Sequence, residues 1–347
     1  MFKPFCSLFI LIFFVSLVSA QSAASETLIP LEGLDPVMLS QGKEVQGDMK
    51  YKVTRGRFQY LFASEENKAA FEKDPSKYEI QLDGHCARMG APTTGDPDLY
   101  AVHKGRIYIF GSAECQTLFK ATPEKYLEVP TVPKSPSAEM VKRGQELIAK
   151  AAEALAPGAK LDQLRSLQRT DVRENKVKNN LVLSFPDTLR QETIRPNFTL
   201  TSIITPSDSF IVVNNAARPM SEASRAAIYK ELNHDLLVLL RARTRPDFKA
   251  SLSSDNTVDV ELSGFTTTLG IDPGTGRVVS QTYTGRGPGG VVGQIVINYS
   301  DYRTVEGLSL PFKMTATFDG QPFPALSATA EAITVNGQID PSTFKKP

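Results

Sequence analysis

The sequence predicts an α+β protein: a small duplicated hairpin-and-helix module, then a larger curved antiparallel β-sheet domain that covers one helix. Three observations predict this organisation. A segment in the first third of the chain recurs 48 to 49 positions later, and a proline-rich stretch follows the second copy. From about Leu164, apolar and polar residues alternate with the period of two that indicates half-buried strands. We expect the module over 28–128, a linker over 129–137, and a helix plus the β domain over 138–347.

The N-terminus predicts export. Residues 1–20 join one positive charge, Lys3, to an apolar run from Phe5 to Val18 and small residues ending at Ala20, which is typical of a cleaved signal peptide. An uncleaved membrane anchor is the alternative, although the run is shorter than the roughly 20 apolar residues of a spanning helix. We therefore expect a periplasmic or extracellular protein with no transmembrane segment after cleavage. With 39 lysines and arginines against 38 aspartates and glutamates, a nucleic-acid partner is not expected.

The internal repeat defines the module. Residues 51–57 return as 100–106 at an offset of 49, and the following residues return at an offset of 48. Each copy has the pattern of a β-hairpin followed by a short helix, for which Ser64 and Ser112 are the expected N-caps. A single hairpin and helix bury little surface, so we expect the two copies to pack together.

The second copy resembles the YHS domain family, over about residues 28–128. The residues that carry the resemblance are Gly105, Tyr108, Phe110, Ser112, Cys115, Phe119, Pro123 and Tyr126. The resemblance implies a cysteine pair associated with heavy-metal handling. Aligning Asp35 with Asp83 places Met38 and Asn67 of the first copy where the second has Cys86 and Cys115. Because one copy holds both thiols and the other holds neither, we expect Cys86 and Cys115 to meet in space.

Three roles for the cysteine pair remain open. A Cys86–Cys115 disulfide suits an exported protein. A soft-metal site for copper or zinc would combine Cys86 and Cys115 with His85 and Met89, a role that the family resemblance favours. The third is a pair of inert buried thiols. His103 ranks below His85 as a ligand because only His85 adjoins a cysteine.

The linker and the next helix have clear local signals. Three prolines between Pro130 and Pro136, without apolar periodicity, predict an extended linker. Ser137 is the expected N-cap of a helix that runs to Leu155 and ends before Pro157-Gly158.

The remainder reads as antiparallel sheet interrupted by one helix. Alternation is clearest over 258–262, 295–299 and 310–318. One helix is predicted from Ser221 to about Arg241, and its dense apolar run requires a cover. The motifs Asp301-Tyr302-Arg303 and Ile339-Asp340-Pro341-Ser342 resemble the lipoprotein-carrier (LolA-like) family over about 160–347. That resemblance implies a concave apolar surface that binds a lipid, another apolar ligand or a partner; a groove filled by the protein's own helix is the alternative.

No catalytic constellation emerges. Residues 285–290 satisfy G-x-G-x-x-G, but a strand rather than a helix follows, so a hairpin loop is expected there instead of a dinucleotide site. The leading hypothesis is an exported envelope binding protein, whose second copy holds a soft metal or a redox-sensitive cysteine pair and whose sheet binds an apolar ligand or partner. The alternative is a non-catalytic structural or interaction protein with a Cys86–Cys115 disulfide, and an enzymatic role ranks last.

Overall fold

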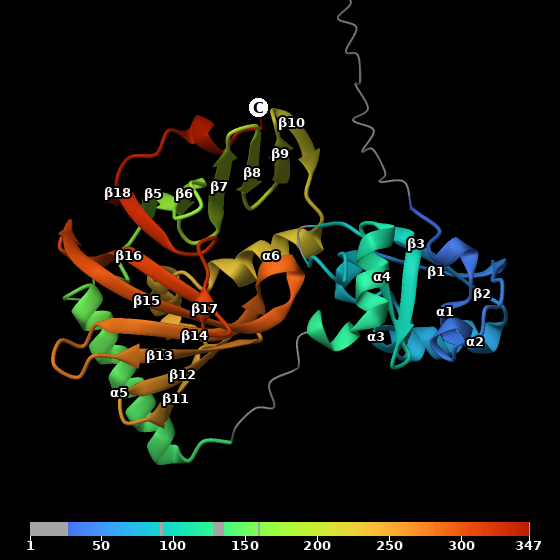
Figure 1. The fold of residues 1–347 in the computed structure, drawn as a ribbon, viewed down its shortest axis with the longest axis horizontal. Coiled ribbons are helices and arrows are strands. Elements are labelled where there is room, and N and C mark those ends of the chain that lie inside the picture. The colour runs from blue at the N-terminus through green and yellow to red at the C-terminus, as the bar shows by residue number, and fades with distance from the viewer. Residues whose placement is uncertain (1–26, 91–92, 128–134, 159, 347) are drawn as a thin grey trace, which may run out of the picture.

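The protein is α+β, with one large antiparallel sheet and two small hairpins (Figure 1). The computed structural model describes residues 27–90, 93–127, 135–158 and 160–346. The predicted signal peptide at 1–20 lies outside the described residues, as does most of the predicted linker at 129–137. In the part of the chain that the structure describes, no helix combines the length and apolar character needed to cross a membrane.

The module contains two copies of one unit, as the repeat predicts. The first copy consists of the 3-10 turn η1 (Leu31–Gly33), α1 (Pro36–Ser40), β1 (Asp48–Arg55), β2 (Phe58–Phe62), α2 (Glu65–Lys73) and α3 (Pro75–Tyr78). The second consists of η2 (Leu82–Gly84), β3 (Asp96–His103), β4 (Arg106–Phe110), α4 (Ala113–Ala121) and η3 (Pro123–Lys125). The hydroxyls of Ser64 and Ser112 accept hydrogen bonds from the backbone N–H groups three residues on, which confirms both N-caps.

The strand register corrects the predicted alignment of the hairpins. Lys52 pairs with Leu61 as Tyr100 pairs with Ile109, and both hairpins have a register shift before that pair. The offset is therefore 48 through both strands and the helix, and Tyr51 is not the counterpart of Tyr100. A repeated tyrosine misled the sequence alignment because it lies beside this irregularity.

The two copies share a core. One buried cluster joins Phe62 and Phe71 of the first copy to Ile80, Ile107 and Ile109 near and within the second. A second cluster belongs to the second copy and surrounds Phe119, and it includes both cysteines. Burying side chains from both copies in one cluster gives the small unit more apolar core than a single hairpin and helix can form.

Helix α5 (Ala138–Leu155) begins at Ser137 as predicted, since the Ser137 hydroxyl accepts the Met140 N–H. The single helix predicted from Ser221 to Arg241 is wrong. The structure has two helices, α6 (Glu222–Leu232) and α7 (Leu236–Arg241), with a break at 233–235. The Asp235 carboxylate accepts the N–H groups of Leu237 and Val238, so it starts a new helix instead of continuing the first.

The sheet of fourteen strands, counted over the described residues, runs in the order β10-β9-β8-β7-β6-β5-β18-β16-β15-β14-β13-β12-β11, with β17 beside β16. Its strands are β5 (Ser166–Arg173), β6 (Lys178–Ser184), β7 (Thr188–Arg195), β8 (Phe198–Ile204), β9 (Ser209–Val213), β10 (Ala216–Pro219), β11 (Lys249–Ser254), β12 (Thr257–Leu262), β13 (Phe265–Ile271), β14 (Val278–Arg286), β15 (Val292–Val305), β16 (Leu308–Phe318), β17 (Gln321–Pro322) and β18 (Ala328–Val335). Most consecutive strands are neighbours joined as hairpins. The exceptions are the connection from β10 to β11, which lie at opposite edges of the sheet, and β18, which lies between β5 and β16.

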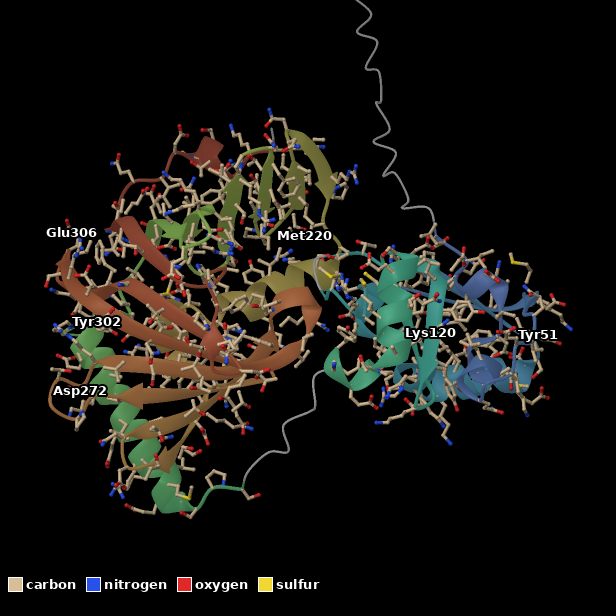
Figure 2. The ribbon with its side chains drawn as sticks, viewed as in Figure 1. Tyr51, Lys120, Met220, Asp272, Tyr302 and Glu306 are labelled. Carbon is tan, nitrogen blue, oxygen red and sulfur yellow. The ribbon has the colours of Figure 1, made fainter. Side chains whose placement is uncertain are left out.

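The sheet covers more than the one helix expected. The main core joins Ile148 and Leu155 of α5 and Leu239 and Leu240 of α7 to the inward residues of the strands. The predicted alternation holds: Val258, Val260 and Leu262 are all fully buried. Helix α5 crosses the strands β11 to β14, while α6 lies on the side of the sheet that faces the module (Figure 1). The ends of the strands near Tyr302 and Glu306 point away from the module (Figure 2).

Candidate functional site

A cavity of about 2070 Å³ lies between the second copy of the module and the β domain. It exceeds the roughly 300–1,000 Å³ of ordinary ligand pockets. The β domain contributes apolar side chains from β6 and β7, from α6 and from β13 to β15, among them Leu189, Ile228, Leu232, Phe265 and Tyr283. The cavity therefore combines a broad apolar wall with residues from a second structural unit.

The module side of the cavity contains two of the predicted site residues, His85 and Met89. His85 is only 6% exposed, and neither ring nitrogen has a partner with hydrogen-bond geometry, although the Thr93 main chain comes near. Burial lowers the pKa of His85, so the ring is neutral at physiological pH. Its nitrogens can offer one donor and one acceptor to a bound molecule.

The two cysteines come together, away from the cavity. Cys86 is 0% and Cys115 7% exposed, and both are in the cluster around Phe119. Burial raises the pKa of the Cys115 thiol, but hydrogen bonds from Ser112, Arg88 and Cys86 and the positive charge of Arg88 outweigh it, so the pKa is lowered. Cys115 also lies in the first turn of α4, where the helix dipole favours a thiolate.

His85 and Met89 do not converge on the sulfur atoms. His85 has an extended backbone, so its side chain and that of Cys86 point to opposite sides. Nη1 of Arg88 lies 3.6 Å from Met89 Sδ and 3.6 Å from Cys115 Sγ, which places a positive charge between those two sulfurs. Over the described residues, no three His, Cys, Asp or Glu side chains form a group that could hold a metal ion.

The first copy has a different pair in place of the thiols. The turns η1 and η2 both have positive φ angles, and Gly47 N donates to Gly33 O as Gly95 N donates to Gly84 O. Asp35 is therefore the counterpart of Cys86, and the alignment of Met38 with Cys86 is wrong. The Asp35 carboxylate accepts a hydrogen bond of 2.7 Å from Asn67, the counterpart of Cys115. In both copies, one side-chain pair thus joins the segment that follows the 3-10 turn to the first turn of the helix after the hairpin.

The loop of 86–90 also docks the module onto the β domain, which sequence reasoning missed. Nη1 of Arg286 donates to Arg88 O at 3.1 Å and to Gly290 O at 3.1 Å. The loop of 287–291, between β14 and β15, approaches so closely that a Cβ on Gly290 would lie under 3.0 Å from Arg88 O. The glycine-rich composition of 285–290 predicts a hairpin loop, but nothing in the local sequence identifies what that loop contacts.

No protein-family model matches the chain, and no curated protein matches it. Among solved structures, a DUF1329 family protein from Desulfovibrio piger is similar, with a TM-score of 0.37 and 11% identity, over 59% of this chain and 97% of that one. A LolA superfamily protein from Nitrosomonas europaea is similar with a TM-score of 0.35 and 11% identity, over 58% of this chain and 97% of that one. At these TM-scores the likeness assigns no function.

Proposed function

We propose that this chain is an exported binding protein of the cell envelope that holds an apolar ligand in the cavity between its module and its sheet. The observation that carries the proposal is the composition of that cavity, in which an apolar wall from several strands and α6 faces the second copy of the module. Apolar side chains around a few placed polar groups are the usual composition of a ligand pocket. The buried, unpartnered His85 is such a polar group.

The alternative of a groove filled by the protein's own helix is less well supported. Helix α7 is packed into the main core, whereas α6, over the side chains whose burial is described, has no fully buried apolar residue and lies along the cavity. Ile228 and Leu232 pack against the core on one side and line the cavity on the other. The covered helix therefore leaves apolar surface facing the open volume. The resemblance of the sequence to LolA-like carriers leads to the same expectation.

A large side chain placed in the cavity should weaken binding. Ala227 lines the cavity from α6, and Ala227→Trp is expected to weaken binding of a neutral fluorescent dye, N-phenyl-1-naphthylamine, at least about tenfold because the indole occupies the apolar volume. Ala149→Trp, on the exposed face of α5, is the matched control and should bind as the unaltered protein does. Dye titration followed by fluorescence makes the measurement, with thermal unfolding to verify that both variants fold. Equal affinity in the two variants, or no binding by the unaltered protein, would refute the proposal.

The cysteine pair supports a second role, that of a redox-sensitive thiol pair. Two observations support it. Cys115 contacts both Arg88 and Cys86, and it lies in the first turn of α4. An external disulfide could be reduced by exchange: the Cys115 thiolate attacks it and releases one thiol, then Cys86 displaces the second and leaves a Cys86–Cys115 disulfide. The position of Arg88 between Met89 and Cys115 disfavours a metal cation there. Copper or zinc binding by two sulfurs alone stays a prediction.

Removing the charge of Arg88 should raise the Cys115 pKa. In a Cys86→Ser background, Arg88→Gln is expected to raise the Cys115 pKa because the thiolate loses its charged hydrogen-bond donor. Thiolate absorbance in the ultraviolet, followed through a pH titration, measures the change. An unaltered titration curve would contradict the assigned contact. Copper(I) or zinc binding that depends on Cys86 would instead favour the metal role, and a protein isolated with both thiols oxidised would favour a structural disulfide.

A further inference from the structure

The cavity contains an arginine whose surroundings are unusual for a cation. Arg241 ends α7 and lines the cavity, and its guanidinium carbon lies 4.4 Å from the centroid of the Phe185 ring. Its Nε is buried and has no hydrogen-bond partner within the described ranges. Val238, one turn earlier in the same helix, also lines the cavity, so the cation lies beside apolar surface.

No carboxylate that the structure describes forms an ion pair with Arg241. The acid whose charge acts on it is Asp162, but Asp162 binds Arg243 at 2.7 Å. Burial lowers the pKa of Arg241, because the cost of desolvation exceeds what Asp162 returns. The ring of Phe185 offers a weaker attraction than an anion would. The Nε–H of the guanidinium therefore lacks a hydrogen-bond partner, and its charge has no ion-pair partner among the described residues.

A second arginine that lines the cavity, Arg173, also has a neighbouring acid that is bound to another arginine. Arg173 lies at the end of β5 and lines the cavity, and burial lowers its pKa as well. Its neighbouring acid, Asp171, binds Arg169 at 2.8 Å. In both places the neighbouring carboxylate is held by a different arginine. Two arginines without an ion-pair partner in the described part of the chain therefore line a cavity that also has a broad apolar wall. A negatively charged ligand would supply the partner that they lack.

We propose that the ligand is an amphipathic anion, an apolar chain with a carboxylate or phosphate head, and that Arg241 binds the head while the apolar wall of α6 and the sheet binds the chain. The planar guanidinium suits both heads, because two parallel N–H groups match two oxygens. The contact with the Phe185 ring limits where the guanidinium can lie. The proposal rests on the proposed function and adds the chemical class of the ligand.

The test is displacement of the neutral dye by matched ligands from the purified mature protein. Dodecanoic acid, dodecyl phosphate and dodecanol share a chain and differ in the head. The acid or the phosphate should bind at least about tenfold more tightly than the alcohol, since a charge-assisted pair forms in a desolvated place. Comparing the two anions shows which head is preferred. Arg241→Gln should remove most of the preference, and Arg241→Lys should restore part of it.

Arg303→Gln is the control variant, because Arg303 is exposed, pairs with Asp301, and lies beside Tyr302 at the far end of β15 (Figure 2). It should keep the full preference. Equal binding of acid, phosphate and alcohol by the unaltered protein would overturn the head-group assignment and leave the apolar cavity intact as the proposed function. A preference that survives Arg241→Gln and disappears in Arg173→Gln would overturn the choice of Arg241. Failure of all three ligands and the dye to bind would reject the proposed function itself.

Discussion

Gly290→Ala is expected to loosen the contact between the module and the β domain. Gly290 has φ +82°, and a Cβ there would lie under 3.0 Å from Arg88 O, a backbone atom that cannot turn aside. Overpacking of this kind typically costs about 1–3 kcal/mol, in addition to the strain of a left-handed conformation. Local opening of the docked loops should increase roughly 5- to 150-fold, at about 1.4 kcal/mol per factor of ten.

Hydrogen–deuterium exchange detected by mass spectrometry measures this opening directly. Peptides that contain 86–90 and 287–291 should exchange faster in the Gly290→Ala protein. Gly320→Ala is the matched control: Gly320 has φ +78°, but an added Cβ would have nothing within 4 Å. It therefore carries the same backbone strain without a clash at the docking loop. If the two variants protect 86–90 equally well, the loops do not depend on this close approach.

The loop of 86–90 joins three features of the molecule. The side chain of Arg88 contacts the Cys115 thiol, its carbonyl accepts from Arg286, and Met89 lines the cavity. Val291, which follows the Gly-rich loop, packs against the cluster that contains both cysteines. A chemical change at the thiols would therefore act on residues that also dock the module and border the cavity.

Local features of the fold could be predicted from the sequence because they depend on few neighbours. Ser64, Ser112 and Ser137 cap helices through their own hydroxyls, so their type and position suffice to identify them. The alternation in β12 and β15 likewise reports burial on one face. The meeting of Cys86 with Cys115 was also expected, although the alignment behind that expectation was wrong.

That alignment failed because the two copies match here in backbone conformation and not in residue type. It rests on two turns of left-handed residues, Leu31–Gly33 and Leu82–Gly84, followed by loops of different length before each hairpin. Asp35 follows the first turn, whereas Asp83 lies within the second. Their identical residue type therefore suggests a match that the backbone does not support. The place of a side chain in a turn is visible only once the hydrogen bonds of that turn are known.

The cavity residues could not be found from the sequence for a different reason. His85, Phe185 and Arg241 lie in three segments that are far apart along the chain, and each is unremarkable in its local pattern. The under-compensated charge of Arg241 depends on Asp162 being engaged by Arg243, which is a tertiary fact. Sequence reasoning predicted a concave apolar surface from family resemblance but could not say which polar side chains it would contain.

Arg169→Met is expected to be the most destabilising single change in the β domain, at about 3–5 kcal/mol in the free energy of unfolding. Arg169 donates to Asp235 at 2.5 Å and to Asp171 at 2.8 Å, and the side chains of these acids are only 8% and 9% exposed. Burial would lower the pKa of Arg169, but its pKa is raised because the two carboxylates outweigh that effect. Removing the guanidinium leaves both carboxylates without their ion-pair partner, although Arg173 remains near Asp171; Asp235 is also the cap of α7.

The pH dependence of the loss in unfolding free energy distinguishes the loss of the ion pairs of Arg169 from a simple loss of packing. Without Arg169 the two buried carboxylates keep the cost of leaving water but lose their ion-pair partner, so the destabilisation should be greatest near neutral pH, where the carboxyl groups of the unfolded chain are ionised. Urea unfolding near neutral pH and at about pH 4 should therefore show a larger difference from the unaltered protein at neutral pH, with part of it recovered as the carboxyl groups take up protons. Lys178→Met, on the neighbouring strand β6, removes a half-exposed partner of Glu331 and should cost less than about 1 kcal/mol. A loss at Arg169 that is the same at both pH values would show that the side chain stabilises the sheet by packing, and that the acids are not held by its charge.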